Sequence, residues 1–320
     1  MATDAPLSNP PRSKLRWYQF SLRTLLVLML LAACGFGWLG FTLQQCRRQQ
    51  AAIAALRNIG ATINFAHERS DGNWATNPQP PGPAWARSWF GDDNFFATVY
   101  SVSSYSPRVS DDDLRNIDEF DDLHRLDLCN ASVSDAGMQH LSRLRHLDHV
   151  DLSRTAVGDA GLQQLASLAD LDTLILEETI ITNDGLRVLS SFPKLRMLSL
   201  RNMPITDDGI QHLHGLDQLE ILILWNVPIT DAALRQVGKL MKLETLMVIH
   251  TKISDDGLRE LANLHQLDSL YLEENEIGDE GIEPLMGLSR LRSLWFRGTR
   301  VTRDGAVKLE HAIPGCNVFR

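Results

Sequence analysis

The apolar positions of this chain repeat with a period of 24 residues through most of its length. Each unit reads L-x-x-L-x-L-x-x-T/N-x-I-S/T-D-x-G-L-x-x-L-x-x-L, and the segment from Leu243 to Leu264 is one good copy. The alternating L-x-L predicts a strand, and the Ser/Thr-Asp pair after it is typical of the start of a helix. The first leucine of each regular unit is Leu123, Leu147, Leu171, Leu195, Leu219, Leu243, Leu267 or Leu291.

Nine units keep this period without an insertion, counting a degenerate first unit that begins at Val99. A fixed period of this length indicates a solenoid, in which each unit packs only on its neighbours. We therefore expect an α/β repeat domain over residues 99–314. Val318 falls one period after Leu294, so residues 315–320 are expected to form a C-terminal cap strand.

The unit resembles a leucine-rich repeat, and its Thr-x-Ile-Thr-Asp-x-Gly-Leu half is similar to the repeats of ribonuclease-inhibitor-like proteins. The resemblance implies a horseshoe with a parallel sheet on the concave side and helices on the convex side. F-box substrate receptors of ubiquitin ligases share this repeat type, but the chain has no F-box. A basic tail, one apolar segment and these repeats together resemble bacterial membrane-anchored leucine-rich-repeat proteins, a likeness that implies no activity.

The N-terminus is expected to be a membrane anchor. Residues 1–24 form a tail with four basic residues and one acidic residue, and an apolar run follows at residues 25–43. As a helix this run is about 28 Å long, close to the roughly 30 Å of bilayer hydrocarbon. A cleaved signal peptide is the first competitor, but its apolar core is usually shorter, about 7–15 residues. The length therefore favours an uncleaved transmembrane helix, a signal anchor.

Three details of the anchor stay open. Leu31–Cys34 resembles a lipobox, so lipidation of Cys34 is an alternative to a spanning helix. Four basic residues precede the run and three follow it, which favours a cytoplasmic N-terminus and extracytoplasmic repeats. A homodimer could form through small residues of the helix, or through Cys46 just beyond it.

Residues 44–60 favour a helical juxtamembrane stalk, and residues 61–98 are expected to hold a linker and an N-terminal cap. Trp85 and Trp89 are four residues apart, so their rings are expected on one helix face that covers the open end of the solenoid. An aromatic ligand site formed with Trp74 is the alternative interpretation.

The charge of the chain excludes some partners. The whole chain carries a net charge of −9, and residues 1–50 carry six basic residues and one acidic residue, net +5, so the remainder carries −14. An acidic solenoid lacks the clustered Lys and Arg that nucleic acids and anionic lipids require, and we expect no nucleic-acid partner. The four cysteines show no disulfide or metal-ligand spacing.

No catalytic or phosphate-binding motif occurs in the sequence, so we expect a protein without enzymatic activity or cofactor. His212 and His214 are two residues apart on an expected helix, which points them away from each other and argues against a metal site. The recurring Asp of each unit is interpreted as a residue at the positive end of a helix dipole. A calcium ladder is disfavoured, because the required glycine-rich turn is missing.

The expected concave face divides into two parts. Strand positions between the leucines are mainly polar in the first four regular units and mainly apolar or aromatic in the next four. Exposed apolar patches with aromatic anchors usually mark interaction sites, which predicts a surface for a protein or peptide partner. Two alternatives remain: the rings stack across strands to stabilise the sheet, or they serve self-association or contact with cell-wall glycan in an envelope protein. The predicted partner-binding residues are Ile221, Ile223, Trp225, Met247, Ile249, Tyr271, Glu273, Trp295 and Arg297.

Overall fold

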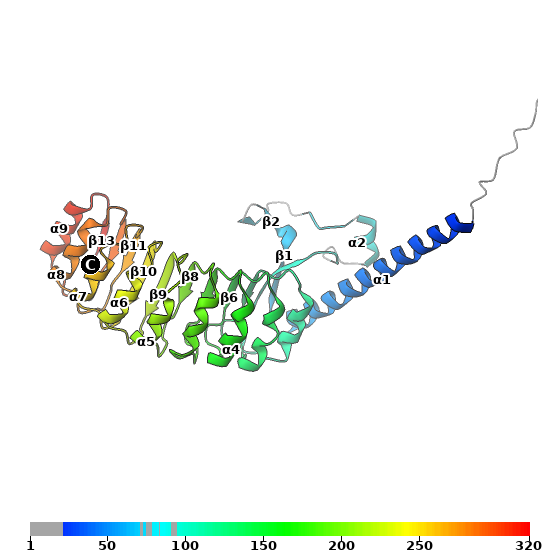
Figure 1. Cartoon of the computed structure of the whole chain (residues 1–320), viewed down its shortest axis with the longest axis horizontal. Helices are drawn as coiled ribbons and strands as arrows, with labels where there is room; N and C mark the ends of the chain where they lie inside the picture. The colour runs from blue at the N-terminus through cyan, green and yellow to red at the C-terminus, as the bar shows by residue number, and fades with distance from the viewer. Residues whose placement is uncertain (1–21, 71–72, 75–78, 83, 91–94) are drawn as a thin grey trace, which may run out of the picture. The chain divides into compact units, whose positions relative to one another are not determined.

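The computed structural model describes residues 22–70, 73–74, 79–82, 84–90 and 95–320, and the chain divides into two units, residues 1–46 and 47–320 (Figure 1). A single helix, α1 (Leu22–Asn58), includes both the predicted apolar span and the predicted stalk. By length and composition it could cross a membrane, a test that a signal sequence near the N-terminus also passes.

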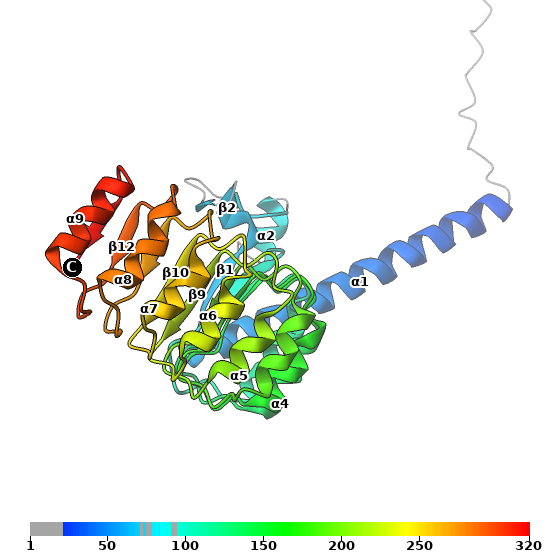
Figure 2. The same ribbon diagram turned by 60° about the vertical axis from the view of Figure 1, so that its left-hand side comes forward.

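The second unit is built on an 11-stranded sheet, and all strand pairs but the first are parallel (Figures 1 and 2). This confirms the solenoid predicted from the 24-residue period. Consecutive strands pair in register, so that each position lies beside its equivalent one period later. In sheet order the strands are β1 (Thr62–Phe65), β4 (Val99–Ser103), β5 (Arg125–Asp127), β6 (His149–Asp151), β7 (Thr173–Ile175), β8 (Met197–Ser199), β9 (Ile221–Trp225), β10 (Thr245–Ile249), β11 (Ser269–Tyr271), β12 (Ser293–Trp295) and β13 (Asn317–Phe319).

Short helices cover one face of this sheet (Figure 2). Each unit has only 24 residues for a strand, a helix and two turns, so the helices are brief and several continue as 3₁₀ turns. The α-helices are α3 (Asp135–Met138), α4 (Asp159–Gln164), α5 (Asp207–Ile210), α6 (Asp231–Val237), α7 (Asp255–Leu258), α8 (Asp279–Ile282) and α9 (Arg303–Ala312). The 3₁₀ segments in the repeats are Asp113–Glu119, Leu141–Arg143, Leu165–Ser167, Gly185–Ser191, Gln211–Leu213, Arg259–Leu261 and Glu283–Gly287.

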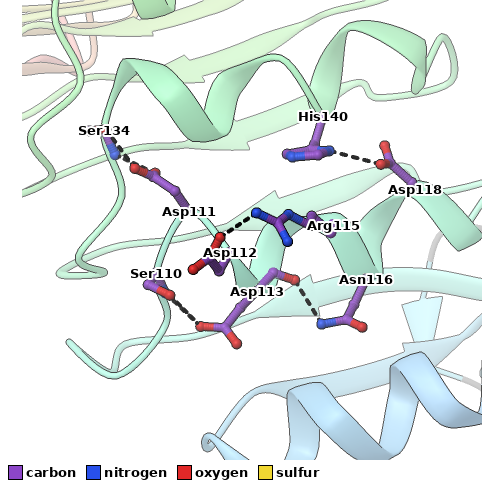
Figure 3. A network of polar contacts seen from close by, with 9 residues as sticks. All are labelled: Ser110, Asp111, Asp112, Asp113, Arg115, Asn116, Asp118, Ser134 and His140. Atoms are coloured by element: carbon purple, nitrogen blue, oxygen red, sulfur yellow. Dashed lines mark hydrogen bonds and ion pairs between the residues drawn. The ribbon is translucent and has the colours of Figure 1, made fainter.

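The recurring Asp joins neighbouring repeats, an interaction that we call the inter-repeat clamp. Asp111 accepts a hydrogen bond from the backbone N–H of Ser134 at 2.8 Å and another from its hydroxyl at 2.6 Å (Figure 3). Asp231 accepts the same two bonds from Ser254, at 2.8 and 2.6 Å. A side chain at the recurring Gly would collide with this carboxylate, as a Cβ at Gly257 would with Asp231. The clamp residues are Asp111, Asp135, Asp159, Asn183, Asp207, Asp231, Asp255 and Asp279.

A second column lies directly after the strands and has a left-handed backbone. Seven non-glycine residues there have φ between 52° and 63°, a conformation that costs about 1 kcal/mol or more for each of them. The backbone N–H of each donates to a carbonyl of the next repeat, as Arg154 does to Glu177 at 2.8 Å. These hydrogen bonds between successive repeats therefore stabilise the left-handed backbone. The residues are Asn130, Arg154, Glu178, Asn202, Asn226, His250 and Glu274.

The N-terminal end of the core is closed by the last turns of α1 and by β1. Ala52, Ile53 and Leu56 are at most 3% exposed, and Phe65 of β1 is 2% exposed in the same cluster. The sequence predicted that the segment around Trp85 would cover this end. The side chain of Trp85, in α2 (Ala84–Phe90), is 67% exposed. Spacing explains the difference, because Ala52, Ile53 and Leu56 form an apolar face on a segment that reads as a polar stalk.

The remaining residues of this region and the C-terminus complete the unit. The side chains of Trp74 and Trp89 lie outside the described residues, while β2 (Arg69–Ser70) and β3 (Asn73–Trp74) form a separate hairpin. At the other end α9 and β13 close the core, and Val318 pairs with Leu294, the partner expected from the period.

Candidate interaction surface

The sheet face opposite the helices carries columns of side chains, because residues alternate across a strand and the strands pair in register. The leucines between these columns are fully buried, as Leu126, Leu174 and Leu222 are. The second residue along this face of each repeat forms a continuous column from β5 to β13: Asp127, Asp151, Ile175, Ser199, Ile223, Met247, Tyr271, Trp295 and Phe319.

Three carboxylates occupy the N-terminal part of this face: Asp127, Asp151 and Glu177, which we call the acidic row. Neutral groups hold each of them. Asp127 accepts a hydrogen bond from the Tyr105 hydroxyl at 2.6 Å, and Asp151 accepts the Ser153 hydroxyl at 2.5 Å. Glu177 accepts the Ser199 hydroxyl at 2.7 Å.

The row is strongly negative. Burial raises the pKa of Asp151, and the charges of Asp127 and Glu177 raise it further. The hydrogen bond and the charge of Asp127 raise the pKa of Tyr105 to about 12. Among the described residues, no Lys, Arg or His forms an ion pair with these three carboxylates. The row is thus fixed in position by neutral donors and forms no ion pair among the described residues, although the charge of Arg154 acts on Glu177.

The basic groups nearby have other contacts. Arg125 lies 3.4 Å from the ring of His149. Burial lowers the pKa of His149, and the charge of Arg125 lowers it further, to about 4. His149 is therefore neutral near pH 7. The Arg201 guanidinium lies over the Trp225 ring, 4.0 Å from its centre, a cation–π contact.

The nine predicted partner-binding residues lie on β9 to β12 or directly after these strands. Ile221, Ile223, Met247, Tyr271 and Trp295 are partly exposed, and we call these five with Trp225, which is 37% exposed, the apolar patch. Ile249 is only 8% exposed and adds little to the surface, because it is covered beside Trp225, its register partner. Glu273 is half-buried and Arg297 is exposed at the border of the patch.

Part of the patch is a ring stack. The rings of Tyr271 and Trp295 are 5.8 Å apart and nearly parallel, and those of Trp295 and Phe319 are 3.8 Å apart. Cross-strand stacking, the alternative interpretation of the aromatic residues, therefore occurs at these three. The sequence interpretation missed Phe319 and Arg201, although each lies one period from a predicted residue, Trp295 and Trp225 respectively.

Several polar atoms at this face have no partner in the part of the chain that the structure describes. Arg201 Nε, Glu273 Oε2 and Trp295 Nε1 are covered but make no hydrogen bond. Burial raises the pKa of Glu273, and Glu274 adds to the effect. An unpaired buried polar group is costly, so these three atoms lower the stability of this face.

The described residues contain no group of three or more His, Cys, Asp and Glu that could hold a metal ion. An open depression of about 580 Å³ borders the apolar patch at Thr245, the register partner of Ile221, and is otherwise lined mainly by loop residues such as Gln266, Arg290 and Pro314. The arrangement on the sheet face suits recognition of a surface or a chain rather than enclosure of a small molecule.

Comparison with known proteins identifies the repeats. The family model described as "Leucine Rich repeat" matches residues 143–166 and 264–286. Comparison with curated proteins finds no match. An internalin from Listeria monocytogenes is 27% identical, with a TM-score of 0.51, and the match covers 65% of this chain and 62% of that one. Internalin C2 from the same organism is 26% identical, with a TM-score of 0.52, and the match covers 66% of this chain and 89% of that one.

The chain thus aligns with less than two thirds of the length of the first internalin. The ribonuclease-inhibitor-like subtype and the membrane anchor stay predictions. Together the period, the parallel sheet and these matches show that the chain contains leucine-rich repeats arranged as a solenoid, structurally similar to internalins.

Proposed function

We propose that this chain is a membrane-tethered protein-interaction module without enzymatic activity, and that its apolar patch binds a protein or peptide partner. The observation that carries the proposal is the partial exposure of six large apolar side chains on one sheet face. Aromatic residues at such patches are the usual energetic anchors of interfaces.

The fold does not require apolar residues at these positions. The column that holds Ile223 and Met247 holds Asp127 and Ser199 in other repeats, with the same backbone register. Ile221, Ile223, Trp225 and Met247 also lie outside the ring stack. The stack accounts for Tyr271 and Trp295 in part, whereas these four need another reason.

Ring orientation favours a protein or peptide over a cell-wall glycan. Sugars stack on the faces of aromatic rings, but both faces of Trp295 are occupied, by Tyr271 and Phe319. One face of Trp225 is occupied by Arg201. Besides the second faces of Tyr271 and Trp225, ring edges and aliphatic groups remain, and this mixture suits the contacts of a protein interface.

The tether is α1. Its apolar segment is long enough to cross a bilayer, and the bias of basic residues favours repeats on the extracytoplasmic side. Such a tether would keep the repeats close to the membrane that α1 spans.

Affinity capture from a lysate of the native cell, with the full chain in detergent as bait, tests the proposal. The native chain is compared with the triple variant Trp225→Ala, Tyr271→Ala and Trp295→Ala. A matched control removes three exposed apolar side chains outside the sheet face: Ile180→Ala, Met241→Ala and Val307→Ala. Circular dichroism checks the folding of each.

We expect a partner that the native chain and the control retain and the patch variant loses. Equal capture by all three folded proteins would exclude the patch as the binding surface. Self-association of the native chain, or its retention on cell-wall glycan with no protein partner, would favour the envelope role.

A further inference from the structure

We propose that the segment bound by this face is an extended peptide with Lys or Arg residues over the acidic row and apolar side chains on the apolar patch, three to seven residues away. The inference rests on the proposed function and adds the chemistry and spacing of the partner. It follows from the juxtaposition of two surfaces on one continuous sheet.

The acidic row differs from the ion-paired carboxylates at the edges of the solenoid, and unlike the carboxylates of the inter-repeat clamp it lies on the sheet face. Along the edges of the solenoid, carboxylates pair with a basic residue one period away, as Asp170 does with Lys194 at 2.5 Å. Glu220 pairs with Arg196 and Glu276 with Arg300 in the same way. Asp127, Asp151 and Glu177 are held only by hydroxyl and backbone donors.

Three arginines neighbour the row. Arg125 contacts His149 in the adjacent column, and Arg201 is placed over Trp225. Arg154 forms an ion pair with Glu178 at 3.1 Å, and its charge also interacts with that of Glu177. Asp127 and Asp151, which form no ion pair among the described residues, therefore keep a negative field on a partly covered surface, where a cationic side chain would be attracted most strongly.

The spacing between the two surfaces sets the length of the partner. Adjacent strands are about 4.8 Å apart, so Asp127 on β5 and Met247 on β10 are separated by about 24 Å along the sheet. An extended peptide spans this distance in about seven residues. Glu177 and Trp225 are two repeats apart, about 10 Å, or about three residues.

The apolar patch supplies the second anchor. Ile223, Met247 and Trp225 are next to one another on β9 and β10, where their partly exposed side chains can contact apolar side chains of a peptide. A cationic part and an apolar part at a fixed spacing would give the face both selectivity and affinity.

A displayed library of random 14-residue peptides, selected on the full chain in detergent, tests this inference. Parallel selections use the row variant Asp127→Asn, Asp151→Asn and Glu177→Gln. The charge-matched control Asp170→Asn, Glu220→Gln and Glu276→Gln removes the same number of negative charges from exposed pairs. The best synthetic peptide is then titrated by fluorescence anisotropy at two salt concentrations.

We expect Lys or Arg three to seven residues from Leu, Ile or Trp in peptides selected on the native chain and the control. The row variant should bind the best peptide at least tenfold more weakly, the control less than twofold, and added salt should weaken native binding. Equal enrichment of basic residues on the row variant, or selection of no peptide, would overturn the inference.

The patch variant separates this inference from the proposed function. If it loses the natural partner while the row variant keeps it, the interaction module stands and the cationic peptide does not. If the selected peptide binds all variants equally, this inference fails, while the proposed function is decided separately by capture of the natural partner. A selection that yields no peptide, together with binding of calcium or spermine that the row variant loses, would point to small cations. That outcome would also overturn the inference.

Discussion

Carboxylates of the inter-repeat clamp and of the acidic row belong to the same repeats but differ in what surrounds them. Each clamp carboxylate accepts a backbone N–H of the next repeat, and its position recurs with one Asn exception, Asn183. The row occupies three repeats, and burial raises the pKa of Asp151 within it. The clamp recurs through the solenoid and joins neighbouring repeats, whereas the row is confined to three repeats and makes no bond that the other repeats share.

This comparison predicts a large loss of stability when a clamp is removed. Asp231→Ala deletes two hydrogen bonds and leaves the N–H and hydroxyl of Ser254 without their acceptor. We expect a loss of about 2 kcal/mol, measured as a lower midpoint in urea. Asp231→Asn is the control, since Asn183 makes the equivalent bond to Thr206 at 2.9 Å. Equal destabilisation by both substitutions would show that charge, rather than the bonds, matters.

The period made much of the fold predictable. A pattern of 24 residues fixes which leucines are buried, and strand alternation then fixes that Trp225, Met247 and Tyr271 lie on the opposite face. The sequence predicted only that the recurring Asp lies at the positive end of a helix dipole, an interaction within one repeat. It did not predict the bond to the next repeat, because the partner of Asp231 is Ser254, 23 residues away.

Other features gave no usable signal in the sequence. Arg154 and Glu178 are not residues that usually adopt a left-handed backbone, which here follows from the hydrogen bonds between stacked repeats. The closure by Ile53 and Leu56 depends on tertiary packing of a helix that also carries polar residues. The residues of the row fall among strand positions that the sequence showed only as mainly polar, and their lack of ion pairs appears only once side chains are placed.

A second prediction separates the two roles of the aromatic residues on the sheet face. Trp295→Ala removes the centre of the ring stack and should cost about 1–2 kcal/mol of stability. Trp225→Ala removes a more exposed ring and one cation–π contact, for which we expect at most about 1 kcal/mol. Thermal unfolding measures both. Equal stability losses would mean that Trp225 is as structural as Trp295 and would weaken its assignment to binding.

The third prediction concerns the clamp and pH. Hydrogen bonds from the Thr302 hydroxyl and N–H lower the pKa of Asp279. The ionised form is thus favoured by folding, so its contribution is present above the unfolded pKa and is lost as pH falls through the folded pKa. Asp279→Asn should lower Tm slightly at pH 7. That difference should shrink steadily below about pH 4, and a Tm difference unchanged down to pH 3 would contradict the assignment.

An Asp→Asn substitution in the acidic row should change Tm in the opposite direction. This change in Tm is the smallest effect that we predict. Because burial and neighbouring carboxylates raise the pKa of Asp151, its ionised form is disfavoured by folding. Asp151→Asn should therefore raise Tm slightly at pH 7, and the gain should disappear as pH falls from the raised folded pKa to the unfolded value of about 3.9. A fall in Tm at pH 7 would mean that the row stabilises the fold. A rise together with weaker peptide binding would show that this carboxylate is retained at the expense of stability because a partner needs its charge.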